Sequence, residues 1–169
     1  LDGQAVAGAV LRVLTGDVNP SGKLAESFPI SYDETPVSQY YPGAEKTSEY
    51  RESIFVGYRC YQTANIPVRF PFGFGMSYTS FAYKNLTVTE QGAEFDLTNT
   101  GKCAGAEVSQ LYISLPGAKV FRPKYELKGF AKTYLEPGET RHVTIALDDK
   151  AFRYFNTKTN RWEIEGGEY

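Results

Sequence analysis

The chain has 169 residues, of which 41% are hydrophobic and 22% are charged, and it carries a net charge of −2. This composition is typical of an ordinary soluble globular protein, and it excludes the collagen-like, disordered and membrane-spanning classes. The chain also lacks the basic excess of nucleic-acid-binding proteins, so we expect neither a nucleic acid nor a membrane as partner. Cytoplasmic and secreted locations both stay open.

Aromatic residues make up 15% of the chain, and 16 glycines with nine prolines supply many turns. Such a composition favours sheets, because broad rings pack well on a pleated surface. The only cysteines, Cys60 and Cys103, are far apart in sequence. We predict two reduced, partly buried thiols, with no disulfide framework, no metal site and no cofactor.

Residues 1–16 carry the one helical pattern, in which apolar residues repeat at steps of three and four. Asp2 is placed to cap its start, and Gly16 ends it before Asn19-Pro20. A single helix this short is marginal in water. We therefore expect earlier sequence to supply a packing partner for it.

Residues 17–50 are broken by prolines and predict a long loop, which is either functional or draped over a neighbouring domain. Residues 50–61 alternate with apolar residues on both faces, which predicts a strand covered on both sides. The glycine- and proline-rich residues 66–81 predict a connector between domains.

From Phe81 onward, short alternating segments are separated by turns, which is typical of an antiparallel sandwich of the immunoglobulin or fibronectin type III class. The expected strands are 81–89, 93–99, 106–114, 125–135, 139–147 and 152–156. Alternation predicts that nine side chains turn inward. They are Leu86, Val88, Phe95, Leu97, Leu111, Ile113, Val143, Ile145 and Leu147.

Five segments follow one another along the chain: GQAVAGAVLRVLTGDVNPSGKLAESFP (3–29), YRESIFVGYRCY (50–61), RFPFGFGMSYTSFAYKNL (69–86), NTGKCAGAEVSQLYIS (99–114) and RPKYELKGFAKTYLEPGET (122–140). In this order they resemble the C-terminal part of glycoside hydrolase family 3. Ser53 and Met76 are conservative departures, where the family often has glycine and leucine.

The resemblance implies a mainly β chain. Residues 1–79 would be the C-terminal remnant of an α/β sandwich domain with a long loop and connector, and residues 80–169 a fibronectin type III-like β-sandwich without its last strand. A sandwich edge left open in this way predicts edge pairing or poor solubility. The resemblance also implies that the partners are the preceding barrel and α/β domain of the same β-glucosidase-like enzyme. A glycoside or oligosaccharide substrate and a homo-oligomer are further expectations.

A retaining glycosidase needs two carboxyl groups about 5–5.5 Å apart, one of them an acid with a raised pKa. Glu45, Glu49 and Glu52 lie in a polar loop, and Asp148-Asp149 lies in a turn. Neither setting raises a pKa. We expect no catalytic residue in this chain, in agreement with the resemblance, which places both catalytic carboxylates outside it.

Other motifs have structural explanations. His142, the only histidine, is expected on a sheet surface or edge. Gly73-Phe-Gly75 is a backbone turn, because no helix or third glycine of a phosphate loop follows. Asn85-Leu-Thr87 fits the glycosylation pattern but falls in a predicted strand.

Exposed aromatic rings are the remaining candidates, because sugar rings stack on them. Tyr40, Tyr41 and Tyr50 lie in the long loop, where they either contact substrate at the rim of a cleft or pack against another domain. Trp162 is expected to be a residue of the sandwich.

Two functions are consistent with these features. The chain is either the non-catalytic C-terminal part of a family 3 enzyme that removes terminal β-D-glucosyl residues, or an autonomous fibronectin-like module that binds carbohydrate or protein. The segments before residue 80 favour the first, because a free-standing module would not carry part of an α/β domain.

Overall fold

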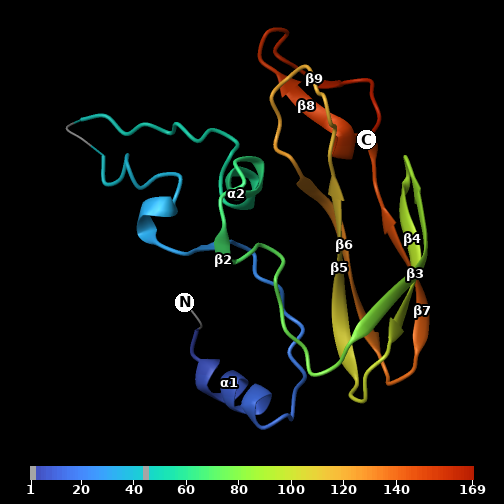
Figure 1. The fold of residues 1–169 in the computed structure, drawn as a ribbon. Helices are drawn as coiled ribbons and strands as arrows, with labels where there is room; N and C mark the ends of the chain where they lie inside the picture. The colour runs from blue at the N-terminus through green and yellow to red at the C-terminus, as the bar shows by residue number, and fades with distance from the viewer. Residues whose placement is uncertain (1–2, 44–45) are drawn as a thin grey trace. The chain divides into compact units, whose positions relative to one another are not determined.

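The computed structural model describes residues 3–43 and 46–169. The elements in chain order are α1 (Val6–Leu14), β1 (Phe28–Pro29), η1 (Tyr32–Glu34), α2 (Tyr58–Thr63), β2 (Val68–Phe70), β3 (Phe81–Thr89), β4 (Gly92–Asn99), β5 (Gly105–Ile113), β6 (Glu126–Leu135), β7 (Thr140–Ala146), η2 (Asp149–Phe152), β8 (Arg153–Asn156) and β9 (Arg161–Ile164). The chain is therefore mainly β, as predicted (Figure 1). No helix in these two stretches is long and apolar enough to cross a bilayer.

The chain divides into two compact units. The first consists of Leu1–Lys23, Gly75–Gln110 and Phe130–Ala146, and the second of Leu24–Phe74, Leu111–Gly129 and Leu147–Tyr169. The first unit contains α1 and most of the long strands, whereas the second contains α2 and the short strands. The unit boundaries differ from the predicted division at residue 80, which stays a prediction.

The first unit is built on a three-stranded antiparallel sheet in the order β3-β4-β7. β5 pairs with β6 in a separate sheet. Alternate residues of β4 and β7 are buried, including Phe95, Leu97, Val143 and Ile145, and Leu135 of β6 is completely buried. The six predicted strands and these four inward-facing side chains are confirmed.

The burial expected of Leu86 and Val88 is wrong, since these side chains are 67% and 63% exposed. A bulge lies between Lys84 and Thr87, and Asn85 has a φ of 55°. Val88 pairs with the buried Ala93 and so shares its inward face, but β3 is an edge strand that is left uncovered at this end. Leu111, Ile113 and Leu147 are half-buried.

The predicted helix is present as α1, and Gly16 follows it with a φ of 81°. Its described residues include no buried side chain, and Leu11 and Leu14 are exposed. The predicted cap, Asp2, lies outside the described residues. The first unit therefore leaves the apolar stripe of this helix uncovered.

The strand predicted over 50–61 is wrong. Residues 51–54 form a turn, and α2 begins at Tyr58. Positive φ angles at Ser53 (50°) and Gly57 (57°) interrupt the extended chain, and the amides of Cys60 and Tyr61 donate to the Gly57 carbonyl. The alternating pattern therefore ends in a helix.

In the second unit, β1 pairs with β2 and β8 pairs with β9. Strand β9 was not predicted. Its Trp162 packs edge-on against Phe155 at a centroid distance of 5.5 Å and remains 64% exposed, so it lies on the surface of the β8-β9 hairpin. Both cysteines are free, with Cys60 half-buried and Cys103 exposed.

Candidate functional site

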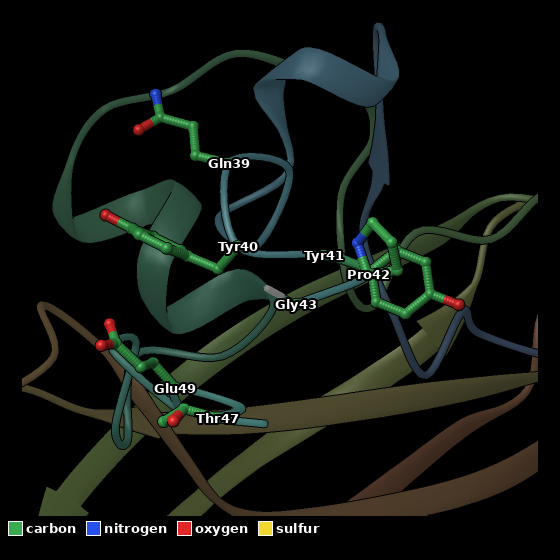
Figure 2. A pocket seen from close by; sticks show the side chains of 7 residues that line it. All are labelled: Gln39, Tyr40, Tyr41, Pro42, Gly43, Thr47 and Glu49. Atoms are coloured by element: carbon green, nitrogen blue, oxygen red, sulfur yellow. The ribbon is translucent and has the colours of Figure 1, made fainter. Parts of the chain in front are cut away.

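The long loop of the second unit forms a hollow of about 370 Å³. It is lined by Gln39, Tyr40, Tyr41, Pro42, Gly43, Thr47 and Glu49 (Figure 2). Two of the three tyrosines predicted at a cleft rim, Tyr40 and Tyr41, thus come together here. Tyr50 does not line the hollow and is 83% exposed.

Backbone hydrogen bonds shape the loop before the hollow. The amides of Tyr40 and Tyr41 donate to the Val37 carbonyl at 2.9 and 3.0 Å. The Ser38 hydroxyl donates to the Asp33 carbonyl at 3.0 Å, which ties the turn to η1. Gly43 has a φ of 89°, a conformation that favours glycine. Local turn chemistry therefore presents the two tyrosines next to each other.

The two rings point in opposite directions from the loop (Figure 2). The Tyr40 ring lies on the same side as Glu49, whereas the Tyr41 ring lies beside Pro42. The Arg51 guanidinium lies 5.0 Å from the centroid of the Tyr40 ring and hydrogen-bonds Glu49. Tyr40 is therefore the ring that combines a stacking surface with a nearby carboxylate.

The charge state of Glu49 follows from this contact. The Arg51 hydrogen bond and charge hold the pKa of Glu49 below its usual value. A lowered pKa suits a hydrogen-bond acceptor and not a general acid, which must stay protonated. The hollow thus combines a carboxylate, an amide, a hydroxyl and an aromatic ring, which are groups that contact polar ligands by hydrogen bonds and stacking.

Of the other carboxylates singled out in the sequence, Asp148 and Asp149 make structural contacts. Asp148 accepts the Lys150 amide at 3.0 Å and caps η2, and Asp149 pairs with Arg153. Glu52 is half-buried. Glu45 lies outside the described residues. Within the described ranges, no group of three His, Cys, Asp or Glu side chains could hold a metal ion.

His142 lies on an exposed face of β7, as predicted, between two carboxylates of β4. Its Nδ1 is 3.0 Å from Asp96 Oδ1, and its Nε2 is 3.8 Å from Glu94 Oε2. The Asn85 side chain donates to Asp96 Oδ2 at 2.7 Å. These groups form a surface polar cluster without a nucleophile.

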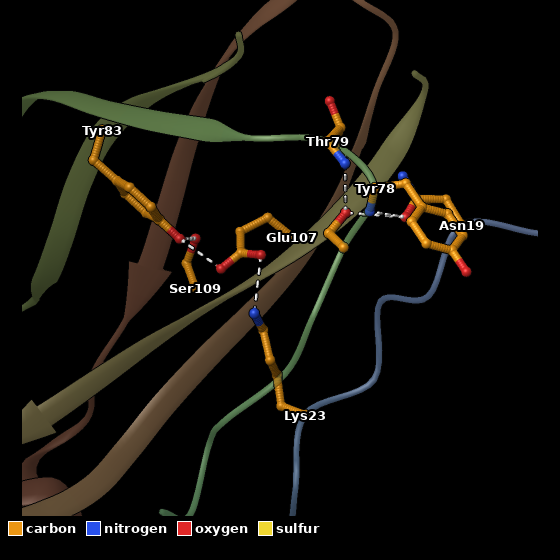
Figure 3. A network of polar contacts seen from close by, with 8 residues as sticks. Asn19, Lys23, Tyr78, Thr79, Tyr83, Glu107 and Ser109 are labelled. Carbon is orange, nitrogen blue, oxygen red and sulfur yellow. Dashed lines mark hydrogen bonds and ion pairs between the residues drawn. The ribbon is translucent and has the colours of Figure 1, made fainter. Parts of the chain in front are cut away.

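A polar network in the first unit was not predicted (Figure 3). Asn19 donates to the Ala104 carbonyl at 2.9 Å and accepts the Ser77 hydroxyl and the Tyr78 amide at 3.0 and 2.9 Å. A Cβ on Gly105 would lie 2.5 Å from the Asn19 side chain, so the close approach requires glycine. The network fastens the Asn19-Pro20 segment to β5 and to the start of β3.

A second set of polar contacts in the same unit centres on Glu107 of β5 (Figure 3). Its carboxylate pairs with Lys23 at 3.1 Å and accepts the Tyr83 hydroxyl at 3.3 Å, and Ser109 donates to Tyr83 at 3.1 Å. Burial is the main cause that raises the Tyr83 pKa. These groups are mutually satisfied, so the network is structural.

Two family models match this chain, one in its N-terminal part and one in its C-terminal part. The Glycosyl hydrolase family 3 C-terminal domain matches residues 1–78, and the Fibronectin type III-like domain matches residues 107–169. The thermostable β-glucosidase B of Acetivibrio thermocellus is 45% identical over 100% of this chain and 23% of its own length. The exo-α-(1→6)-L-arabinopyranosidase of Bifidobacterium breve is 43% identical over 99% of this chain and 23% of its own length.

Solved structures agree with this similarity. The β-glucosidase of Bifidobacterium adolescentis superposes with a TM-score of 0.90 at 41% identity, over 98% of this chain and 25% of that one. The β-glucosidase of Kluyveromyces marxianus in complex with glucose superposes with a TM-score of 0.89 at 43% identity, over 96% and 20%. The chain thus spans about a quarter of the relatives that it matches.

Proposed function

Since the chain belongs to glycoside hydrolase family 3 and corresponds to the C-terminal region of its members, we propose that it is the non-catalytic part of a retaining β-glucosidase. The complete enzyme would remove terminal non-reducing β-D-glucosyl residues, and this region would stabilise its catalytic domains. The match over residues 1–78 argues against a free-standing fibronectin-like binding module.

The family matches carry this proposal, and the surroundings of the described carboxylates are consistent with it. Among the described aspartates and glutamates, each one with a shifted pKa has it lowered: Glu49, Asp96, Glu139 and Glu163. The causes are hydrogen bonds and cations at the surface. Retaining hydrolysis needs an acid whose pKa is raised so that it can protonate the leaving oxygen. This surface setting of the four carboxylates supports a scaffold role for the region, and we propose that the acid–base pair lies in other domains of the complete enzyme.

We propose further that Tyr40, Tyr41 and Tyr50 contribute to the rim of the substrate cleft in the complete enzyme. Tyr40 is the strongest of the three, because its ring shares one side of the hollow with Glu49. A sugar unit could stack on this ring while its hydroxyls bond the carboxylate.

Hydrolysis of p-nitrophenyl β-D-glucopyranoside tests the non-catalytic assignment. The chain alone should give no turnover above a buffer blank. A chimera of the Acetivibrio thermocellus β-glucosidase B, with this chain replacing its matching region, should fold and hydrolyse the substrate. Turnover by the chain in proportion to its concentration, or a folded but inactive chimera, would refute the assignment.

The substrate is tested in the complete enzyme that contains this chain. We expect the β-D-glucoside to be hydrolysed faster than p-nitrophenyl α-L-arabinopyranoside, the alternative suggested by the relative from Bifidobacterium breve. Tyr40→Ala should raise KM about 3- to 10-fold with kcat retained, because stacking acts equally in ground and transition states. Tyr134→Ala, an exposed tyrosine on β6, is the control and should change neither constant.

A further inference from the structure

Three cations of the second unit surround one carboxylate. The Glu126 carboxylate, at the start of β6, lies 3.9 Å from Arg59 Nη2, 3.6 Å from Arg122 Nη2 and 3.4 Å from Lys128 Nζ. We call Arg59, Arg122 and Lys128 the basic cluster. One carboxylate facing three cations leaves two positive charges in excess, and none of the three distances is that of a short charge-assisted hydrogen bond.

The basic cluster is also poorly satisfied. The Arg122 side chain is only 9% exposed, and its buried Nη1 has no hydrogen-bond partner. The buried Nε of Arg59 has none either. Buried guanidinium groups are costly unless their N–H groups are bonded. The cluster therefore has donors and charge for an additional acceptor.

The surroundings hold the basic cluster in place. The Tyr58 hydroxyl accepts the Leu127 amide at 2.9 Å, and the Thr63 hydroxyl accepts the Lys124 amide at 3.0 Å, so both ends of α2 are fastened to the segment that carries Glu126. These contacts set Arg59 beside Glu126. The donors are thus positioned before any ligand binds.

Two tyrosine rings pack around the Arg122 guanidinium. The rings of Tyr154 and Tyr169 lie 5.6 and 6.0 Å from its guanidinium carbon and offer only cation–π contacts. Two acceptors of the same unit, Gln62 Oε1 and Glu165 Oε2, are buried and also lack a hydrogen-bond partner, while Glu165 Oε1 accepts the Lys119 amide at 2.7 Å. Among the described residues, no ion pair joins Glu165 to the basic cluster.

We propose that the basic cluster binds one small oxyanion of the phosphate or sulfate class between Arg59, Arg122 and Lys128. Arginine forks match the oxygens of such anions, and donors arriving from three side chains need more oxygens than a single carboxylate group offers. Arg59 is 37% exposed and Lys128 is 17% exposed, which leaves a path for a small ion to enter. This site does not depend on the proposed glycosidase function.

Thermal unfolding and isothermal titration of the chain with inorganic phosphate test the proposal. At constant ionic strength, phosphate should raise Tm and chloride should not, because a ligand bound only by the folded state stabilises it. Sulfate should act as phosphate does. Glucose 6-phosphate should bind more weakly than inorganic phosphate, because the nearly buried Arg122 leaves little room for a sugar ring. Tighter binding of the sugar phosphate would overturn the assignment to a free ion.

Variants locate the site. Arg122→Gln should weaken phosphate binding about tenfold, the loss expected for one charge-assisted bond. Arg141→Gln on β7 is the control and should bind phosphate as the parent does, because Arg141 is exposed and its ion pair is with Glu139, outside the basic cluster. If Arg122→Gln does not fold, Lys128→Gln decides, with a smaller but measurable loss. Equal phosphate responses of the parent, Lys128→Gln and Arg141→Gln would overturn the proposal.

Discussion

Different kinds of contact stabilise each of the two units internally. In the first unit, aliphatic and aromatic side chains of β4, β6 and β7 form a core between regular strands. In the second, short elements are joined by ring contacts, such as the stack of Tyr58 on Phe72 at 4.5 Å, and by hydrogen bonds from side chains to backbone. The first unit is encoded by a repeating local pattern, whereas the second depends on single contacts between residues distant in sequence.

The largest effect is expected in the aliphatic core of the first unit. Leu97 is completely buried, so Leu97→Ala should lower the free energy of unfolding by about 2–5 kcal/mol through lost burial and the cavity left behind. Urea denaturation measures the change. Leu86→Ala is the control, and its exposed side chain should leave the unfolding free energy within about 0.5 kcal/mol. Equal losses in both variants would mean that β3 is covered in solution.

A smaller effect is expected in the polar network that fastens Asn19 to the first unit. Asn19→Ala removes three hydrogen bonds and leaves the Tyr78 amide and the Ala104 carbonyl without this partner. We expect a loss of about 2 kcal/mol, since these groups are only partly buried. Hydrogen exchange at the Tyr78 amide should accelerate. An unchanged exchange rate would show that the network is dispensable.

In the second unit, removal of the Tyr58 hydroxyl tests how much a single hydrogen bond contributes to holding α2 in place. Tyr58→Phe keeps the ring stack but removes the acceptor of the Leu127 amide. The expected loss is about 1 kcal/mol, together with faster exchange of that amide. A loss of unfolding free energy as large as that of Leu97→Ala would mean that the stack of Tyr58 on Phe72 does not hold α2 without the hydroxyl bond.

The smallest expected effects on stability are electrostatic, and each unit has one carboxylate with a lowered pKa that can be tested. Asn85 and His142 lower the pKa of Asp96 in the first unit, and Asn156 and Thr159 lower that of Glu163 in the second. A carboxyl whose folded pKa is depressed stabilises the fold above its unfolded pKa and loses this contribution as pH falls through the folded value. Asp96→Asn and Glu163→Gln should therefore each flatten the decline of Tm in the acid range below about pH 4.5. A decline as steep as that of the parent would exclude a role for these bonds.

Sequence patterns predicted the strands of the first unit well and the region around α2 of the second poorly, because alternation reports only the local direction of side chains. Alternation identified six strands of the fibronectin-like region and the inward faces of β4 and β7, because side-chain direction in a strand has a period of two. The same alternation over 50–61 was misleading, since the positive φ of Gly57 and the packing of Tyr58 on Phe72 end the extended chain there. Local periodicity carries no information about either contact.

The candidate hollow was only partly predictable. Tyr40 and Tyr41 stood out as aromatic residues in a polar loop, but the pairing of Arg51 with Glu49 beneath Tyr40 depends on how the loop folds back. The basic cluster was missed because Arg59 and Glu126 are 67 positions apart in the printed sequence and neither belongs to a charged run. Its unbonded guanidinium atoms are visible only once the side chains are placed.

The distribution of the two free cysteines gives the molecule an internal pair of chemical reporters. Cys103 lies in the first unit and is exposed, whereas Cys60 lies within α2 of the second, where burial raises the pKa of its thiol. Because the thiolate is the reacting form, a maleimide dye at neutral pH will label the exposed Cys103 before the half-buried Cys60. The native sequence thus permits one fluorophore at a defined place in the first unit, and the slower labelling rate of Cys60 reports on the surroundings of α2 in the second.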